Sequence, residues 1–209
     1  MKRTLIFDFD GVVADTREML FSIFSEHDPT MSSEDFSAHF DGNVHQEPRV
    51  KFTPRSLARM HDEYCRRIDQ KHVEAAINPI ERLTSEHRLF IVSSGEERGI
   101  NNVLQQAGVR RCFEAIYGHN THQSKVAKFE KLRDQFGVSL TQSVFITDTL
   151  GDIREAQKVG LKTIAVTFGF HDRARLMRSR PNAIVDSWNE VESALEQQIT
   201  QAGQKGRTD

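Results

Sequence analysis

Four short stretches of the chain are apolar at almost every position, and together they give the clearest pattern in the sequence. They are TLIFDF (residues 4–9), RLFIVSS (88–94), SVFITD (143–148) and KTIAVTF (162–168). Continuous apolar positions, in place of alternating ones, are typical of strands that are covered on both faces, as in parallel sheets. Two weaker stretches, FEAIYG and AIVD, are further candidate strands.

The stretches between the later strands have apolar residues at helical spacing. After residue 124, for example, Val126, Phe129, Leu132 and Phe136 share one face of a helix, and Gly137 follows as a C-terminal stop. Strands that alternate with helices are typical of an α/β domain built on a parallel sheet. We therefore predict an α/β fold whose core is a doubly wound, Rossmann-like parallel sheet.

The connection between the first and second strands is much longer than the others. It has roughly 75 residues, whereas a crossover between parallel strands needs only about a dozen. Its own apolar residues recur at helical spacing. We predict a helical cap domain over residues 16–78, inserted into an α/β core domain of residues 1–15 and 79–209. The segment NPIERLTSEH is then the crossover helix that returns to the second strand.

Composition excludes several classes of function. The 209 residues are 37% hydrophobic and 28% charged, which suits one domain, or one domain with an insertion. The formal net charge of −2 gives no reason to expect nucleic acid or a membrane as a partner, and no apolar run approaches the roughly 20 residues that span a bilayer. The N-terminal stretch fails as a signal peptide, and two cysteines without CxxC spacing suit reduced thiols. We expect a cytoplasmic monomer or homodimer.

Polar residues follow several of the predicted strands. Asp8 and Asp10, two residues apart, can point to one side, while Ser93 and Asp148 stand at the ends of two other strands. The carboxyl ends of parallel strands border one crevice, so these side chains should gather there. Buried carboxylates are costly unless a positive charge compensates them. Lys125, at the start of a predicted helix, and Mg²⁺, which prefers oxygen ligands and is often shared with a phosphate, supply that charge.

These residues form four motifs in a fixed order. They are DFDGVVADT (8–16), IVSS (91–94), Lys125 and DTLGD (148–152). The set resembles the motifs of the haloacid dehalogenase superfamily of phosphohydrolases, and the insertion falls where that family carries a small helical cap. The segment from Ala165 to Leu195 further resembles the closing segment of phosphoglycolate-phosphatase-like members. The resemblance implies a Mg²⁺-dependent phosphatase that acts on a small phosphorylated metabolite.

The resemblance also implies roles for the carboxylates. Asp8 would attack phosphorus and become an aspartyl-phosphate, and Asp10 would protonate the leaving oxygen and then activate water. The metal ligands would be Asp8, the backbone carbonyl of Asp10, and Asp148. An acid at position 10 favours phosphate chemistry over dehalogenation, because a leaving alkoxide needs a proton and a halide does not.

The remaining motif residues would hold the substrate and the metal in place. The resemblance implies that Ser93 and Lys125 bind the phosphoryl oxygens, with the amide of Ser94 assisting. Asp152 would act from a second shell by orienting a water on the metal. Lys128 is a rival to Lys125, because the proline that commonly follows the motif lysine is replaced by Val126.

The cap and the choice of substrate leave alternatives open. Polar residues of the cap loop 41–52, Asn43 and Arg49 among them, are candidates for recognising the leaving group of the substrate. Alternatively, the loop is an exposed linker between the cap helices. The same motifs fit a phosphomutase of the β-phosphoglucomutase kind, a phosphonate hydrolase, or a non-catalytic binding protein on this fold. Phosphoglycolate, sugar phosphates and nucleoside monophosphates all remain possible substrates. We interpret His119 and His122, an HxxH pair, as surface residues and not as a second metal site.

Overall fold

A six-stranded sheet lies at the centre of the computed structural model, which describes residues 2–46 and 48–205, with side chains as far as Gln197. The strands are β1 (Arg3–Phe7), β2 (His87–Val92), β3 (Phe113–Tyr117), β4 (Val144–Thr147), β5 (Lys162–Val166) and β6 (Ala183–Val185). Their order is β3-β2-β1-β4-β5-β6, and every neighbouring pair is parallel. The predicted α/β fold with a doubly wound parallel sheet is confirmed.

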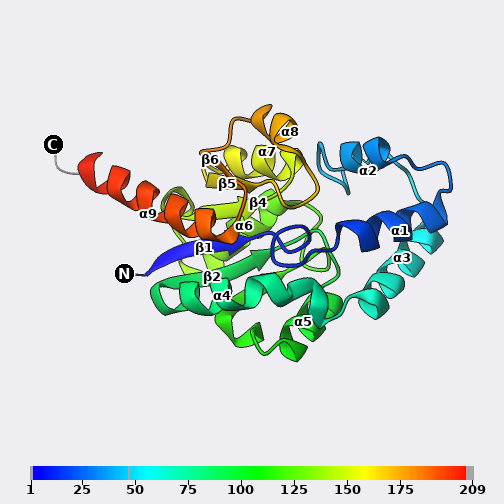
Figure 1. Cartoon of the computed structure of the whole chain (residues 1–209), viewed down its shortest axis with the longest axis horizontal. Helices are drawn as coiled ribbons and strands as arrows, with labels where there is room; N and C mark the ends of the chain where they lie inside the picture. The colour runs from blue at the N-terminus through cyan, green and yellow to red at the C-terminus, as the bar shows by residue number, and fades with distance from the viewer. Residues whose placement is uncertain (1, 47, 206–209) are drawn as a thin grey trace.

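Helices cover both faces of this sheet (Figure 1). One face packs against α4 (Glu74–Glu86), α5 (Glu97–Gln106) and α9 (Trp188–Lys205), and the other against α6 (Lys125–Phe136) and α7 (Leu150–Lys158). In β1, Leu5 and Phe7 enter the first of these cores and Ile6 enters the second. The continuous apolar stretches in the sequence are therefore strands buried on both sides, as predicted.

The strand order reverses between β1 and β4, and this reversal positions the candidate site. From β1 the chain builds outward through β2 to β3, and it then returns to β4 on the other side of β1. The connecting helices therefore lie on opposite faces, which leaves a crevice outside the carboxyl ends of β1 and β4. The residues after these two strands, Asp8 and Asp148, are the first to enter it.

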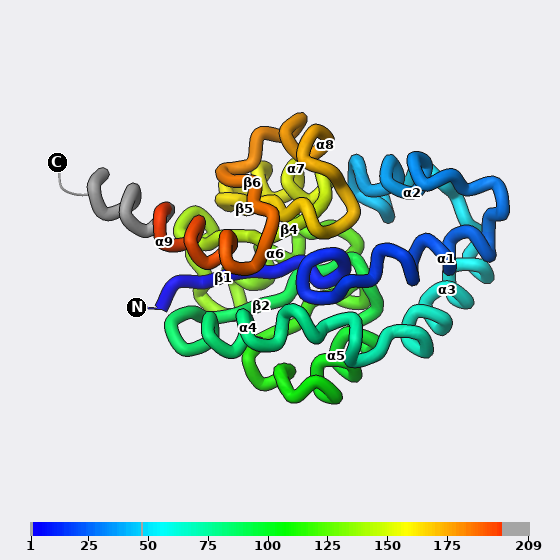
Figure 2. Tube along the Cα trace, in the orientation of Figure 1, coloured from blue at the N-terminus to red at the C-terminus, as the bar shows by residue number. Residues whose placement is uncertain are grey.

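The insertion forms a group of helices to one side of the sheet, away from the start of β1 and from α9 (Figures 1 and 2). These helices are α1 (Arg17–His27), α2 (Ser33–His39) and α3 (Pro54–Arg67). Phenylalanines at positions 21, 24, 36, 40 and 52 pack together, and Phe170 of the core joins them. Arg175 of the short helix α8 (Arg173–Met177) ties them to the core through ion pairs with Glu34 and Asp41. We propose that these helices act as a separate cap domain.

The crossover helix differs from the prediction at its start. Helix α4 begins at Glu74, and Pro79 lies inside it, so the predicted boundary at residues 78/79 falls within a helix. A proline beyond the first turn of a helix removes one backbone hydrogen bond. Burial of Ala76, Pro79 and Ile80 against the core offsets that cost. Residues 206–209 of the predicted core segment lie outside the described residues.

The other described elements are short. They are three 3-10 turns at Gln70–Val73, Arg110–Cys112 and Leu140–Gln142. Within the described ranges, none of the helices combines the length and the apolar character that crossing a membrane requires.

Phe129 of α6 gives a direct test of this packing. Its side chain is fully buried and packs edge-on against Phe145 of β4, with ring centroids 5.1 Å apart. We expect Phe129→Ala to lower the free energy of unfolding by about 3–5 kcal/mol, because it removes buried apolar surface and leaves a cavity. Urea titration followed by circular dichroism measures the change. Met177→Ala, at a side chain 60% exposed, should change it by less than about 0.5 kcal/mol; equal losses in both variants would contradict this packing.

Candidate active site

The chain makes a tight loop directly after β1. The amide of Asp8 donates to the carbonyl of Ile146, which continues the pairing of β1 with β4 by one residue. The carbonyl of Phe9 then accepts from the amides of residues 12, 13 and 14. Gly11, at φ +77°, has a backbone conformation that side chains rarely adopt, and a Cβ there would lie 2.0 Å from Asp148 Oδ2. Glycine at this position lets the loop approach Asp148.

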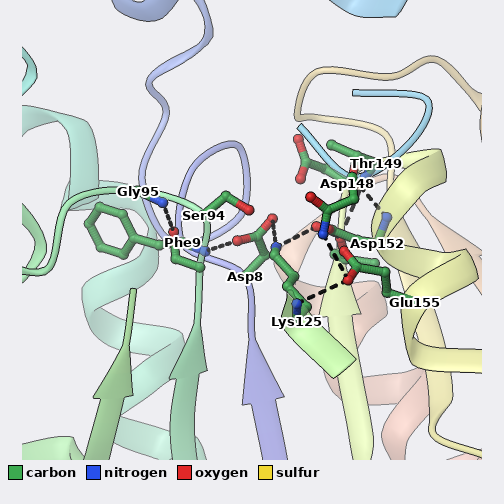
Figure 3. Close-up of polar contacts among 12 residues, drawn as sticks. Asp8, Phe9, Ser94, Gly95, Lys125, Asp148, Thr149, Asp152 and Glu155 are labelled. Atoms are coloured by element: carbon green, nitrogen blue, oxygen red, sulfur yellow. Dashed lines mark hydrogen bonds and ion pairs between the residues drawn. The ribbon is translucent and has the colours of Figure 1, made fainter. Parts of the chain in front are cut away.

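Asp8 lies in a buried cluster of charges (Figure 3). Lys125 Nζ is 2.9 Å from Asp8 Oδ2 and 2.6 Å from Asp152 Oδ2, and the amide of Phe9 donates to Asp8 Oδ1 at 2.7 Å. Burial raises the pKa of Asp8 well above its usual range, although Lys125 opposes the rise. Burial also disfavours ionised Asp152, yet Lys125 holds the pKa of Asp152 below its ordinary value.

Lys125 is held in place from several directions. It begins α6, and its backbone amide donates to Glu155 Oε1 of α7 at 3.0 Å. Its ammonium lies 5.4 Å from the centre of the Phe145 ring. Burial would lower the pKa of Lys125, but Asp152 and Asp8 outweigh it and raise that pKa above its ordinary value. The ammonium therefore stays charged within the cluster.

Lys128, the predicted rival, lies elsewhere. Its side chain is fully buried, and its ammonium donates to the backbone carbonyl of Ser93. Burial lowers the pKa of Lys128 to about 7, and the nearby charge of Lys125 adds to this effect. Of the two lysines, Lys125 is the one that contacts the carboxylate of Asp8.

Asp148, after β4, has the features of a cation ligand. Its Oδ2 accepts from the amide of Phe170 at 2.7 Å, whereas its buried Oδ1 has no hydrogen-bond partner among the described residues. Burial raises the pKa of Asp148 to about 7; the amide of Phe170 opposes the rise and the charge of Asp152 adds to it. A buried carboxylate oxygen without a donor, near two further acids, is the donor set that a hard divalent cation such as Mg²⁺ prefers.

Asp10 connects the core to the cap. Its Oδ1 accepts hydrogen bonds from Thr16 Oγ1 at 2.8 Å and from the hydroxyl of Tyr64 at 3.1 Å. Tyr64 belongs to cap helix α3 and is buried. Burial raises the pKa of Asp10 to about 6, although both hydrogen bonds lower it. A carboxyl group with a pKa near neutrality can both give and take a proton.

The serines after β2 lie at the same edge of the sheet. Ser93 is buried, and its hydroxyl accepts from the amide of Gly95 at 2.8 Å. The carbonyl of Ser94 lies 3.3 Å from Nε2 of His45 in the cap loop. Ser93 and Ser94 both line the cavity that contains Asp8 and Lys125. The structure therefore brings together the residues predicted to act at the strand ends.

A cavity of about 410 Å³ lies between this cluster and the cap. Asn43 lines it and donates to Glu155 Oε1 at 3.0 Å and to the carbonyl of Gln123 at 3.2 Å. Arg49 does not line it: this exposed residue lies in a separate hollow with Asp28. The structure does not support the predicted role of Arg49 in reading the substrate. Glu47 of this loop lies outside the described residues.

Sequence reasoning missed two residues of the site. Tyr64 reaches Asp10 across more than fifty positions, and no local pattern indicates that contact. Glu155 was detectable: it lies three residues after Asp152 on the same helix face, next to a motif already identified. Its Oε1 accepts from Asn43, Ser124 and the amide of Lys125, so it joins the cap loop to the start of α6.

The motifs and fold have counterparts in known proteins. Residues 5–166 match the family model for haloacid dehalogenase-like hydrolases, and the chain belongs to this family. It is 24% identical over 211 residues to a phosphoglycolate phosphatase of Synechococcus elongatus, covering 95% of this chain and 100% of that protein. The predicted membership in this superfamily is confirmed, and the chain is an enzyme of the phosphatase type.

Solved structures share the fold. A predicted phosphatase from Clostridium acetobutylicum superposes with a TM-score of 0.77 at 18% identity, covering 94% of this chain and 99% of that one. A β-phosphoglucomutase from Clostridium difficile gives 0.72 at 16% identity, covering 96% and 100%. At these identities the likeness shows the fold alone, so it does not separate a phosphatase from a mutase.

The contact between Tyr64 and Asp10 predicts a shift in the pH dependence of turnover. The tyrosine hydroxyl stabilises the charged form of Asp10, so Tyr64→Phe should raise the pKa of this acid by roughly one unit. The limb of the kcat/KM profile for p-nitrophenyl phosphate that reports the ionisation of Asp10 should therefore move to higher pH.

Tyr117→Phe is the matched control for this change. Its hydroxyl donates to Gln135 in the last turn of α6, ten residues along the helix from Lys125, so the profile should not move. A Tyr64→Phe enzyme with an unshifted profile would show that the hydrogen bond does not tune Asp10.

Proposed function

We propose that the chain is a Mg²⁺-dependent phosphatase that hydrolyses a small phosphorylated metabolite through an aspartyl-phosphate on Asp8. The observation that carries this proposal is the buried contact between Asp8 and Lys125, with an Asp148 oxygen at the same crevice that has no hydrogen-bond partner among the described residues. Phosphoryl transfer depends on positioning and on neutralising charge, and this cluster supplies fixed groups for both.

Asp8 is the nucleophile of this proposal. One of its oxygens forms a bond to phosphorus while the bond between phosphorus and the leaving oxygen breaks. Lys125 stabilises the charged carboxylate before attack and faces the phosphoryl oxygens as negative charge develops on them. The backbone amide of Phe9 donates to Asp8 Oδ1, which leaves the other oxygen to face Lys125.

Asp10 handles the proton in both steps. In its protonated form it gives a proton to the leaving oxygen, and as a carboxylate it then takes a proton from the water that cleaves the aspartyl-phosphate. Its pKa of about 6 suits both forms near neutral pH. Thr16 and Tyr64 hold the carboxyl group from the side of the loop and from the side of the cap.

Mg²⁺ fits the same crevice. Asp8, the backbone carbonyl of Asp10, and Asp148 would hold it, and when bound it supplies positive charge against the phosphoryl oxygens. The raised pKa values of Asp8 and Asp148 arise where buried acids lie together, and a cation there would favour their charged forms.

The cavity supports a small substrate. Its volume of about 410 Å³ is in the range of small-molecule sites, and Asp8 and Lys125 are among the residues that line it. The cap contributes mainly apolar side chains to the wall, at positions 20, 24, 40, 52, 57 and 60. Closure of such a wall over the phosphate would keep bulk water away from the aspartyl-phosphate.

Asp8→Asn tests the nucleophile. The amide cannot form the acyl-phosphate, so release of phosphate should fall on the order of 10³-fold or more. The assay uses p-nitrophenyl phosphate together with a panel of phosphoglycolate, sugar phosphates and nucleoside monophosphates, with Mg²⁺ present. The same change at Asp15, an exposed residue of the same loop, should keep activity within about twofold. An Asp8→Asn enzyme with unchanged turnover rejects Asp8 as nucleophile.

Asp148→Asn tests the cation site. Chelation by EDTA should abolish phosphate release, and added Mg²⁺ should restore it. In calorimetric titration, Asp148→Asn should weaken Mg²⁺ binding by at least about tenfold, because it removes a charged ligand. Asp15→Asn again serves as the control and should bind as the wild type does. Equal Mg²⁺ affinity in Asp148→Asn and wild type would place the cation elsewhere.

A further inference from the structure

Two histidines and a glutamate from three distant segments meet at the edge of the cavity. His61 belongs to cap helix α3, Glu96 follows the serines after β2, and His119 lies in the loop after β3. His61 Nδ1 is 4.0 Å and His119 Nε2 is 3.8 Å from the same oxygen, Glu96 Oε2. One ligand atom from each of the three residues lies within 4.8 Å of the other two.

These distances are too long for hydrogen bonds and leave space between the groups. His119 Nδ1 is buried and has no hydrogen-bond partner in the part of the chain that the structure describes. The ring of His119 lies 4.6 Å from that of His61 and 5.4 Å from that of His45, measured between centroids. The imidazoles therefore cluster around one carboxylate without bonding to it directly.

We propose that His61, Glu96 and His119 form a binding site for a transition-metal cation of the zinc class. Two imidazole nitrogens and one carboxylate oxygen are a common ligand set for Zn²⁺, and a fourth position is left for water. Nitrogen ligands select against Mg²⁺, so this site is chemically distinct from the oxygen cluster around Asp8. At bond lengths near 2.0 Å, tetrahedral ligands stand about 3.3 Å apart, and small rotations of three partly exposed side chains bring the observed spacing to that value.

A cation bound at this site would affect the position of the cap. His61 is carried by the cap, whereas Glu96 and His119 are carried by the core, and both His61 and Glu96 line the cavity. A cation bound to all three would join cap to core at the cavity edge. Because such an ion stabilises only the conformation that brings the ligands together, it favours the closed cap and slows exchange of substrate and product.

The two histidines of the HxxH pair have different surroundings in the structure. His119 and His122 do not act together: His122 Nδ1 accepts from the amide of Ser124, two residues further on. His119 instead lies against His61. The position of His61 on a cap helix gave no indication of this contact in the sequence. Of the pair, only His119 belongs to the cluster.

Titration of the full-length protein with Co²⁺ tests the site. Co²⁺ replaces Zn²⁺ and absorbs strongly in the visible range when its sites are tetrahedral, but weakly in an octahedral oxygen site. With Mg²⁺ in excess, we expect one saturable Co²⁺ site with the strong absorption. His61→Gln and His119→Gln should each weaken it at least about tenfold, because each removes one of three protein ligands. His122→Gln is the matched control and should leave the titration unchanged.

Other results would overturn the proposal. A spectrum that is unchanged in His61→Gln and His119→Gln, but lost in Asp148→Asn, would mean that Co²⁺ enters only the oxygen cluster. Absence of saturable Co²⁺ binding in the wild type would also overturn the proposal. Because the readout is binding without substrate, these outcomes are separate from whether Asp8 acts as a nucleophile.

Discussion

The contact of Lys125 with Asp8 and Asp152 is the interaction on which the site depends. Asp8 and Asp148 are buried at the ends of two neighbouring strands and Asp152 is buried in the first turn of α7, and uncompensated charges in such a place would oppose folding. One ammonium, 2.9 Å and 2.6 Å from two of these acids, compensates part of that charge. The remaining negative charge is what makes the crevice suited to a divalent cation and, with the cation, to a phosphate. The excess of buried negative charge that is costly to the fold therefore also supports the proposed cation and phosphate site.

The fold fixes this cluster by bringing separate segments to one edge. The reversal of strand order places β1 beside β4, and Gly11 lets the loop after β1 approach Asp148. The start of α7 also approaches the cap segment closely. The amide of Gly151 donates to the carbonyl of Phe40, and a Cβ at Gly151 would lie 2.4 Å from the carbonyl oxygen of Gly42. The first turn of α7, which carries Asp152, therefore packs directly on the cap loop. Because of this contact, the position of the cap and the geometry of the site depend on each other.

The sequence indicated the parts of this arrangement that are local. Apolar stretches buried on both faces predicted the strands, and the polar residues ending them predicted where Asp8, Ser93 and Asp148 would meet, since parallel strands share one carboxyl edge. Contacts set by the relative position of the cap were not predictable in this way. Tyr64, His61 and Arg49 all lie in the cap segment; two of them face the site and one does not, although nothing in their spacing separates them. Helix α4 extended across Pro79 because burial outweighed a local signal.

The two lysines of α6 show how one helix can supply different chemistry at neighbouring positions. Lys125 and Lys128 are three residues apart on the same face, and both are buried. Acids surround the first, which raises its pKa, whereas the second donates to the carbonyl of Ser93 and has a pKa lowered to about 7 by burial and by the charge of Lys125. A second full positive charge here would compete with a metal ion for the same acids. In the proposed mechanism Lys125 is the fixed cation beside the phosphate, whereas Lys128 holds the strand end that carries Ser93.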